Sequence, residues 1–125
     1  MAQPAAATGT DQARILTTAV VKAAAIMGLG QKNLAGILNL SAATVSRMHR
    51  SEYCLKPGDA SWQLGLLLVR LFRGLDAMTG GDEASLTAWL HTFNTDLAAV
   101  PAEHIGTVPG LVHVADYVDA FRARI

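Results

Sequence analysis

The segment that most constrains the fold of this chain is residues 31–50, QKNLAGILNLSAATVSRMHR. Its apolar residues are spaced so that two short helices can lock together across a tight turn; they are Leu34, Leu38, Leu40, Val45 and Met48. Ala35 is small where the helices must approach closely, and Asn39 tolerates the positive φ that such a turn needs. The pattern predicts a helix-turn-helix, a unit that commonly lays its second helix in the major groove of DNA.

The second of these helices, which Ser41 is suited to cap, carries the candidate DNA contacts. They are the polar groups expected on or beside its solvent face, at Ser41, Thr44, Ser46, Arg47, His49 and Arg50. Hydroxyl groups can reach phosphates or base edges, and Arg47 can make a bidentate contact to guanine. The surface is only modestly basic, so two copies on a palindromic site would supply affinity that one copy lacks. The alternative is a helical hairpin that packs and binds nothing.

The remaining sequence predicts further helices separated by glycine and proline signals. A first helix is expected to start at Thr10 or Asp11 and to end near Met27, after a disordered lead-in over residues 1–10. Later helical segments are expected at about 59–78, 83–90, 101–105 and 107–125. No five-residue run alternates as a half-buried strand does. We therefore predict an all-α fold, with a helix-turn-helix region over 11–58 and a second helical region over 59–125.

Charge is unevenly distributed along a chain whose formal net charge is zero. Residues 1–73 hold eight basic and three acidic side chains, whereas residues 74–125 hold two basic and seven acidic ones. Such an asymmetry suggests two partners of opposite character, although chance variation is an alternative at this length. The composition is 51% apolar and only 16% charged, which suggests that another chain covers part of the surface.

Neither catalysis nor a membrane location has support in the sequence. His91, His104 and His113 are not at metal-ligand spacing, and Cys54 is far from them. Glycine-rich phosphate loops and nucleophile motifs are absent, so we expect no enzyme, no cofactor and no metal. The single cysteine, the lack of a signal-peptide pattern and the short apolar runs predict a cytoplasmic protein.

The second half of the chain resembles the toxin-binding domain of the Xre/MbcA/ParS antitoxins. The resemblance covers residues 68–125 and begins at Leu68–Leu71, with Arg70 and Arg73. It continues through Gly80, Gly81, Ala84, the pair Trp89–Leu90, Asn94, Leu97, Pro101, Gly110, Tyr117 and Phe121. The helix-turn-helix upstream is similar to the Xre-like N-terminal part of that family. Family members often end in a glycine and a short apolar tail, whereas this sequence ends in Phe121-Arg122-Ala123-Arg124-Ile125.

The resemblance implies an antitoxin that silences a RES-domain toxin, an enzyme that consumes NAD⁺ or uses it to ADP-ribosylate a target. It also implies operator DNA as a partner, autorepression, and a homodimer or a hetero-oligomer with the toxin. The residues it points to for toxin binding are Arg70, Arg73, Trp89, Asn94, Tyr117, Phe121, Arg122, Arg124 and Ile125.

Each of these residues also has a structural explanation. The two upstream arginines can pair with acids such as Asp76, Trp89 can belong to the core, and Asn94 can organise a loop. Arg122 and Arg124 can be a solvated helix end. Two other functions remain open at this point: a stand-alone regulator whose second half dimerises or senses a ligand, and a structural module with a vestigial helix-turn-helix.

Overall fold

The structure is a computed structural model that describes residues 4–124, with residues 4–10 described by their backbone. Within this range the chain forms seven helices and no strand, and the one β-bridge joins Asn94 to Ala99 in a loop. The helices are α1 (Pro4–Ile26), α2 (Gln31–Leu38), α3 (Ala42–His49), α4 (Ala60–Met78), α5 (Glu83–His91), α6 (Pro101–His104) and α7 (Val108–Ala123). The all-α prediction is confirmed for the part of the chain that the structure describes.

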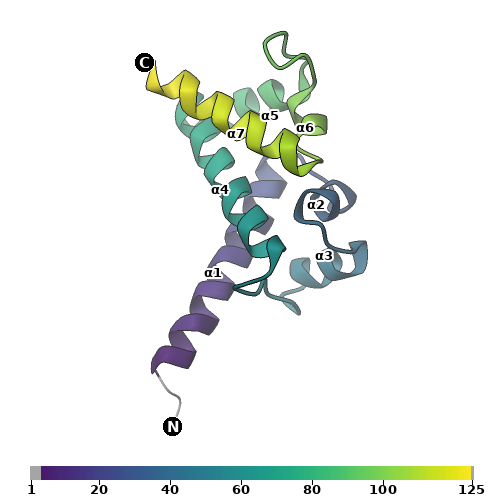
Figure 1. Cartoon of the computed structure of the whole chain (residues 1–125), viewed down its shortest axis with the longest axis vertical. Coiled ribbons are helices and arrows are strands. Elements are labelled where there is room, and N and C mark those ends of the chain that lie inside the picture. The colour runs from purple at the N-terminus through teal and green to yellow at the C-terminus, as the bar shows by residue number, and fades with distance from the viewer. Residues whose placement is uncertain (1–3, 125) are drawn as a thin grey trace.

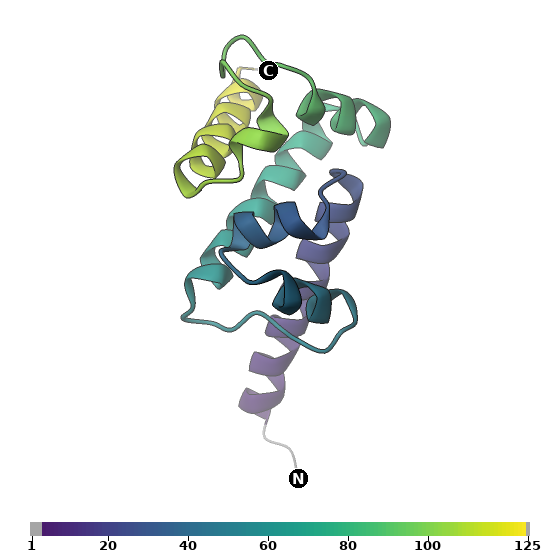
Figure 2. The same cartoon turned by 90° about the vertical axis from the view of Figure 1, so that its right-hand side faces the viewer.

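Helix α4 lies at the centre and contacts α1, α2, α5 and α7. The α2–α3 pair covers one side of α1 and α4, while α5, α6 and α7 gather around the C-terminal end of α4 (Figures 1 and 2). The leucines of α4 form an apolar stripe that allows this helix to lie at the centre of the fold, and Leu68, Leu71 and Leu75 are almost fully buried. At Gly74, an added Cβ would lie 2.8 Å from Cγ1 of Val118, so the glycine allows α7 to cross close to α4.

The first helix begins earlier than the sequence predicted. It starts at Pro4 rather than at Thr10 or Asp11, so most of the expected lead-in is helical. Proline suits the first turn of a helix. Residues 5–7 are all alanine, the residue type with the highest helix propensity. The first turns of α1 extend beyond the other helices (Figure 1).

Two side chains of α5 bind the end of α1. The Thr87 hydroxyl donates to the carbonyl of Ile26 at 3.0 Å, and His91 Nε2 lies 2.9 Å from the carbonyl oxygen of Met27. The last carbonyls of a helix have no partner within the helix, so these bonds satisfy groups that would otherwise need water. They join the region before the helix-turn-helix to the second half of the chain, and we call them the α1–α5 clasp.

Among the described residues, no helix combines the length and the apolar character that crossing a bilayer requires.

Candidate DNA-binding and partner-binding surfaces

The turn between α2 and α3 has the geometry that the sequence predicted. Asn39 adopts the left-handed conformation with φ of 57°, and the backbone N–H of Leu40 donates to the carbonyl of Ala35 at 3.0 Å. This arrangement closes α2 as a glycine commonly does. Leu34 and Leu38 of α2 and Val45 of α3 are completely or almost completely buried, so the angle between the two helices is fixed by packing.

Ser41 holds the start of α3. Its Oγ accepts a hydrogen bond from the backbone N–H of Thr44 at 3.1 Å and lies 2.9 Å from Thr44 Oγ1. The predicted cap is therefore confirmed, and the Ser41 hydroxyl has a structural task whether or not it also meets DNA.

Ser41→Ala should lower the free energy of unfolding by about 1 kcal/mol, because the N–H of Thr44 loses its partner. Urea denaturation followed by circular dichroism would measure the change. Ser46→Ala on the same helix removes a hydroxyl that caps nothing and should change stability by less than about 0.5 kcal/mol. Equal losses in the two variants would show that Ser41 contributes no capping energy.

Arg47 of α3 and Arg50, the residue that follows the helix, are exposed and held by hydroxyl groups of α3. Arg47 donates to Thr44 Oγ1 at 3.1 Å, and Arg50 donates to Ser46 Oγ at 2.7 Å and to Glu52 at 3.1 Å. This ladder directs both guanidinium groups along the solvent face of α3. Arg47 has no carboxylate partner among the described residues, so its charge is the more available of the two.

His49 also lies on α3 and is exposed, but one of its two ring nitrogens is engaged in a hydrogen bond. Its Nδ1 is 2.9 Å from the carbonyl oxygen of Val45, and because a carbonyl only accepts, Nδ1 must carry the proton. Neutral His49 therefore offers only Nε2, as an acceptor, to any partner.

In the second half of the chain, the residues that we predicted to bind a partner lie on two different sides of α7. Arg70 forms ion pairs with Asp119 and, at 3.7 Å, with Asp116, which raise the pKa of its guanidinium above the ordinary value. At 100° per residue these two aspartates lie on the opposite side of α7 from Phe121. The proposed partner Asp76 is therefore wrong for Arg70, which ties α4 to α7 instead.

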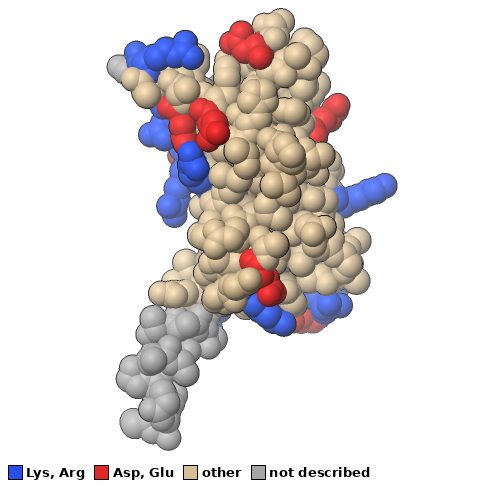
Figure 3. All heavy atoms as spheres, viewed as in Figure 1, with Lys and Arg blue, Asp and Glu red and all other residues tan. Residues whose placement is uncertain are grey.

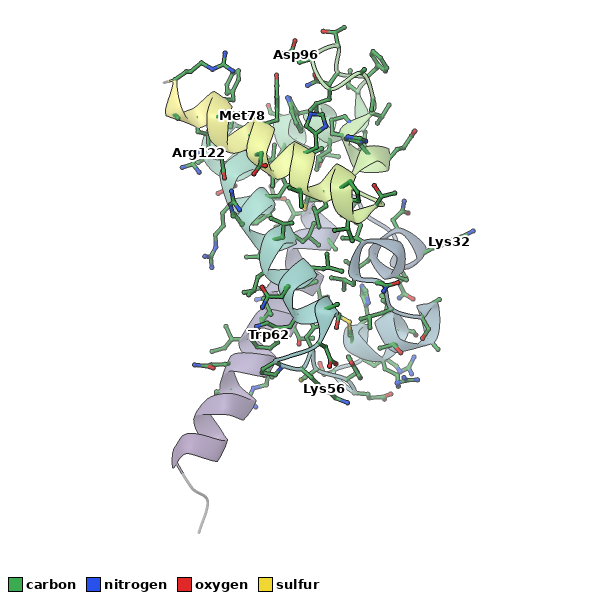
Figure 4. All side chains as sticks on the ribbon, in the orientation of Figure 1. Lys32, Lys56, Trp62, Met78, Asp96 and Arg122 are labelled. Carbon is green, nitrogen blue, oxygen red and sulfur yellow. The ribbon has the colours of Figure 1, made fainter. Side chains whose placement is uncertain are left out.

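Arg73 and Arg122 belong to the same side of the molecule as Arg70. Arg73 lines a groove between α1 and α4 together with Ile15, Trp62 and Leu66. The Arg122 side chain runs within 4 Å of the position that a Cβ at Gly74 would take, beside α4. Figure 4 shows Arg122 at the left edge of the upper part of the molecule and Asp96 at the top of the same part.

On the other side of α7, Tyr117 and Phe121 of that helix adjoin Trp89 of α5, and Phe93 follows in the loop after α5; we call these four aromatic side chains the aromatic face. The Tyr117 ring is 6.3 Å from the Trp89 ring and 6.5 Å from the Phe121 ring, measured between centroids. Phe93 and Trp89 line one shallow hollow. Phe93 is 60% exposed and Phe121 is 40% exposed, whereas Trp89 and Tyr117 are half-buried. Large apolar side chains that remain this exposed are typical of a surface that another molecule covers.

The loop after α5 is held against this face by polar contacts. Asn94 Oδ1 accepts from the backbone N–H of Leu97 at 3.1 Å, so Asn94 organises the loop. Tyr117 donates its hydroxyl to Asp96 at 2.7 Å. That hydrogen bond, together with partial burial and the carboxylate charge, raises the pKa of the Tyr117 phenol. Tyr117 therefore stays neutral and keeps the loop beside α7.

Arg124 and Ile125 differ in what the structure shows. Arg124 follows Tyr117 by seven positions and therefore falls on the same side of α7, and its positive charge acts to lower the pKa of the Tyr117 phenol against the larger effect of Asp96. Ile125 lies outside the described residues. Phe93 and Asp96 were missed by the sequence reasoning, because both lie in the loop after α5, where no helical spacing relates them to Trp89 or Tyr117.

The uneven charge along the sequence does not divide the surface into a basic and an acidic half. Arg70 from the basic half and Asp119 from the acidic half neutralise each other across α4 and α7. Figure 3 shows basic groups gathered near the C-terminal end of α7 and at the opposite end of the body, with a largely uncharged surface between them.

Two histidines that are far apart in sequence meet in space. His104 Nε2 of α6 and His113 Nδ1 of α7 are 3.0 Å apart, and their rings meet edge to face. The sequence spacing had argued against any metal-ligand pairing among the histidines. Among the described residues, no three metal-binding side chains come together.

Comparison with protein-family models gives two matches that together span most of the chain. Residues 6–70 match the antitoxin Xre-like helix-turn-helix domain. Residues 74–124 match the antitoxin Xre/MbcA/ParS C-terminal toxin-binding domain. A search of curated proteins found no match. The boundary between the two matched regions falls inside α4, so one helix contributes to both.

Proposed function

The chain belongs to the Xre/MbcA/ParS antitoxins, and from this premise we propose that it neutralises a RES-domain toxin in the cytoplasm by covering the active site of the toxin. Such a toxin consumes NAD⁺ or uses it to ADP-ribosylate a cellular target. The observation that carries the proposal is the aromatic face, which is exposed and lies entirely within the region that matches a toxin-binding domain.

The aromatic face has the properties of an interface core. Aromatic side chains bury much apolar area at little conformational cost, and interfaces are enriched in them. Trp89 and Tyr117 are already held by their neighbours, so little entropy is lost when a partner covers them. Phe93 and Phe121 supply the exposed apolar area, and Arg124 supplies a positive charge at the edge.

The remaining predicted toxin contacts have lesser parts in this proposal. Arg70 stabilises the α4–α7 packing through Asp119, and Asn94 shapes the loop that presents Phe93. Arg73 and Arg122 lie beside α4, so a toxin that touches them must extend around α7.

We also propose that the protein represses its own operon through α3, as a homodimer or in a larger assembly with the toxin. Arg47 is the principal candidate for base readout, since it is exposed and directed by Thr44. Thr44, Ser46, His49 and Arg50 surround it, and Ser41 fixes the start of the helix. One copy offers few phosphate contacts, so two copies on a palindrome are needed for tight binding.

Co-expression with the neighbouring open reading frame tests the antitoxin activity. We expect a stable complex and rescue of growth, and we expect deletion of residues 121–125 to abolish both. Rescue that survives the deletion would move the contact away from the end of α7. Absence of both toxicity and complex formation would overturn the proposal.

Arg47→Ala should weaken operator binding by about tenfold or more per site, because a bidentate contact to guanine is worth roughly 1–3 kcal/mol. Electrophoretic mobility shift with the promoter of the operon would measure the loss. Arg73→Ala removes the same charge far from α3 and should leave operator affinity within about twofold of the wild type. Equal losses in both variants would mean that only overall charge matters.

A further inference from the structure

His104 and His113 form the one close pair of imidazole rings among the described residues. Their facing nitrogens, Nε2 and Nδ1, are 3.0 Å apart. His113 is exposed and His104 is partly exposed, so solvent and small ions reach them directly. We propose that the two histidines chelate a divalent transition-metal ion that accepts nitrogen ligands at right angles, of the Ni²⁺ or Cu²⁺ type.

The separation of the two nitrogens allows both of them to bind one ion. With metal–nitrogen bonds of about 2.05 Å, two ligands at a right angle lie about 2.9 Å apart, and two at the tetrahedral angle lie about 3.3 Å apart. The observed 3.0 Å is the separation of a hydrogen-bonded pair and lies within this range, so one ion can engage both nitrogens without separating the helices. Imidazole nitrogens suit Cu²⁺ and Ni²⁺, which accept ligands at right angles. Metal binding replaces the hydrogen bond between the rings: the donor ring changes tautomer, so that the bridging proton moves through solvent to its other ring nitrogen, and the two freed lone pairs turn to the ion, with water completing the coordination.

The backbone between the two histidines makes the pair rigid. A Cβ at Gly110 would overlap the carbonyl oxygen of His104, so α6 and the first turn of α7 touch through their backbones. Thr107 caps α7 by accepting from the N–H of Gly110 at 3.1 Å. Because these contacts fix the two helices, the rings are already close to each other before an ion arrives, and ordering them costs little.

A bound ion would link α6 to α7 one turn before Tyr117. His113 and Tyr117 are four residues apart and therefore share one side of α7. The site adjoins the aromatic face but uses none of its side chains, so the inference holds whether or not the aromatic face binds a toxin.

Isothermal titration of the tag-free full chain with Ni²⁺ alone tests the inference. We expect one ion per chain, and we expect His104→Ala and His113→Ala each to weaken the affinity at least tenfold. His49→Ala, which removes a histidine whose Nδ1 is engaged by Val45, should leave the affinity unchanged. Circular dichroism would verify that each variant is folded, and His104→Gln offers a second variant that retains a hydrogen-bonding side chain.

Electron paramagnetic resonance with Cu²⁺ provides a second readout. The wild type should show coupling to two imidazole nitrogens, and either single variant should show coupling to one at most. Failure of the wild type to bind Ni²⁺ and Cu²⁺, or binding that both alanine variants retain, would overturn the inference.

Discussion

Gly110→Ala is expected to destabilise the fold by about 3 kcal/mol or more, the largest effect of any single methyl group that we foresee. The added Cβ would overlap the carbonyl oxygen of His104 and lie 2.8 Å from the carbonyl carbon and 2.9 Å from Thr107 Oγ1. Backbone atoms cannot rotate away as a flexible side chain can, so α6 must separate from α7 or the Thr107 cap must break. The melting temperature should fall by about 10 °C or more.

Gly36→Ala is the matched control for this substitution. Gly36 lies within α2, and an added Cβ would be 3.9 Å from its nearest neighbour, the carbonyl oxygen of Gly106. Alanine is favoured over glycine inside a helix, so this variant should be as stable as the wild type or up to about 1 kcal/mol more stable. Thermal and urea denaturation of both variants would compare them. A Gly110→Ala protein as stable as Gly36→Ala would show that the α6–α7 contact yields easily.

Phe121→Ala should weaken binding to the toxin by about 2 kcal/mol or more, roughly thirtyfold in Kd, while leaving the fold intact. Phe121 stands at the end of the aromatic face and is 40% exposed, so its removal leaves no cavity in the core. Only the complex should therefore lose energy. Titration calorimetry against the co-purified toxin would give the affinity, and the melting temperature of the free protein should hardly change.

Val112→Ala provides the control on the same helix. Val112 is 41% exposed, nearly the same fraction as Phe121, and a separation of nine positions places it on the opposite side of α7. This variant should bind the toxin as the wild type does. A loss equal to that of Phe121→Ala would mean that the toxin surrounds α7 or contacts the side that carries Asp119.

The helix-turn-helix was predictable because its determinants are local. Asn39 and Ser41 lie within a few residues of the groups they contact, so spacing along the chain fixes spacing in the fold. The start of α1 was not predicted, because the helix propensity of the alanine run was given less weight than the caps at Thr10 and Asp11.

The proposed partner-binding surface was predictable only in part. Trp89, Tyr117 and Phe121 were anticipated, and they lie together. The side of α7 on which each arginine falls depends on how α4 crosses α7, and no local pattern encodes that crossing. Arg70 and Asp119 are 49 residues apart, and the contact between His104 and His113 depends on the loop that Thr107 and Gly110 shape.

The α1–α5 clasp sets a mechanical limit on regulation. Thr87 and His91 hold the carbonyls of Ile26 and Met27 immediately before α2, and α4 passes through both matched regions without a break. Among the described residues, these contacts tie the region that matches a helix-turn-helix domain to the region that matches a toxin-binding domain. If a toxin binds the aromatic face and α3 binds the operator, as proposed, toxin binding is therefore not expected to move α3 relative to the aromatic face. We expect any effect of the toxin on transcription to come from bringing copies of the antitoxin together on the operator, or from steric clash between the toxin and the DNA.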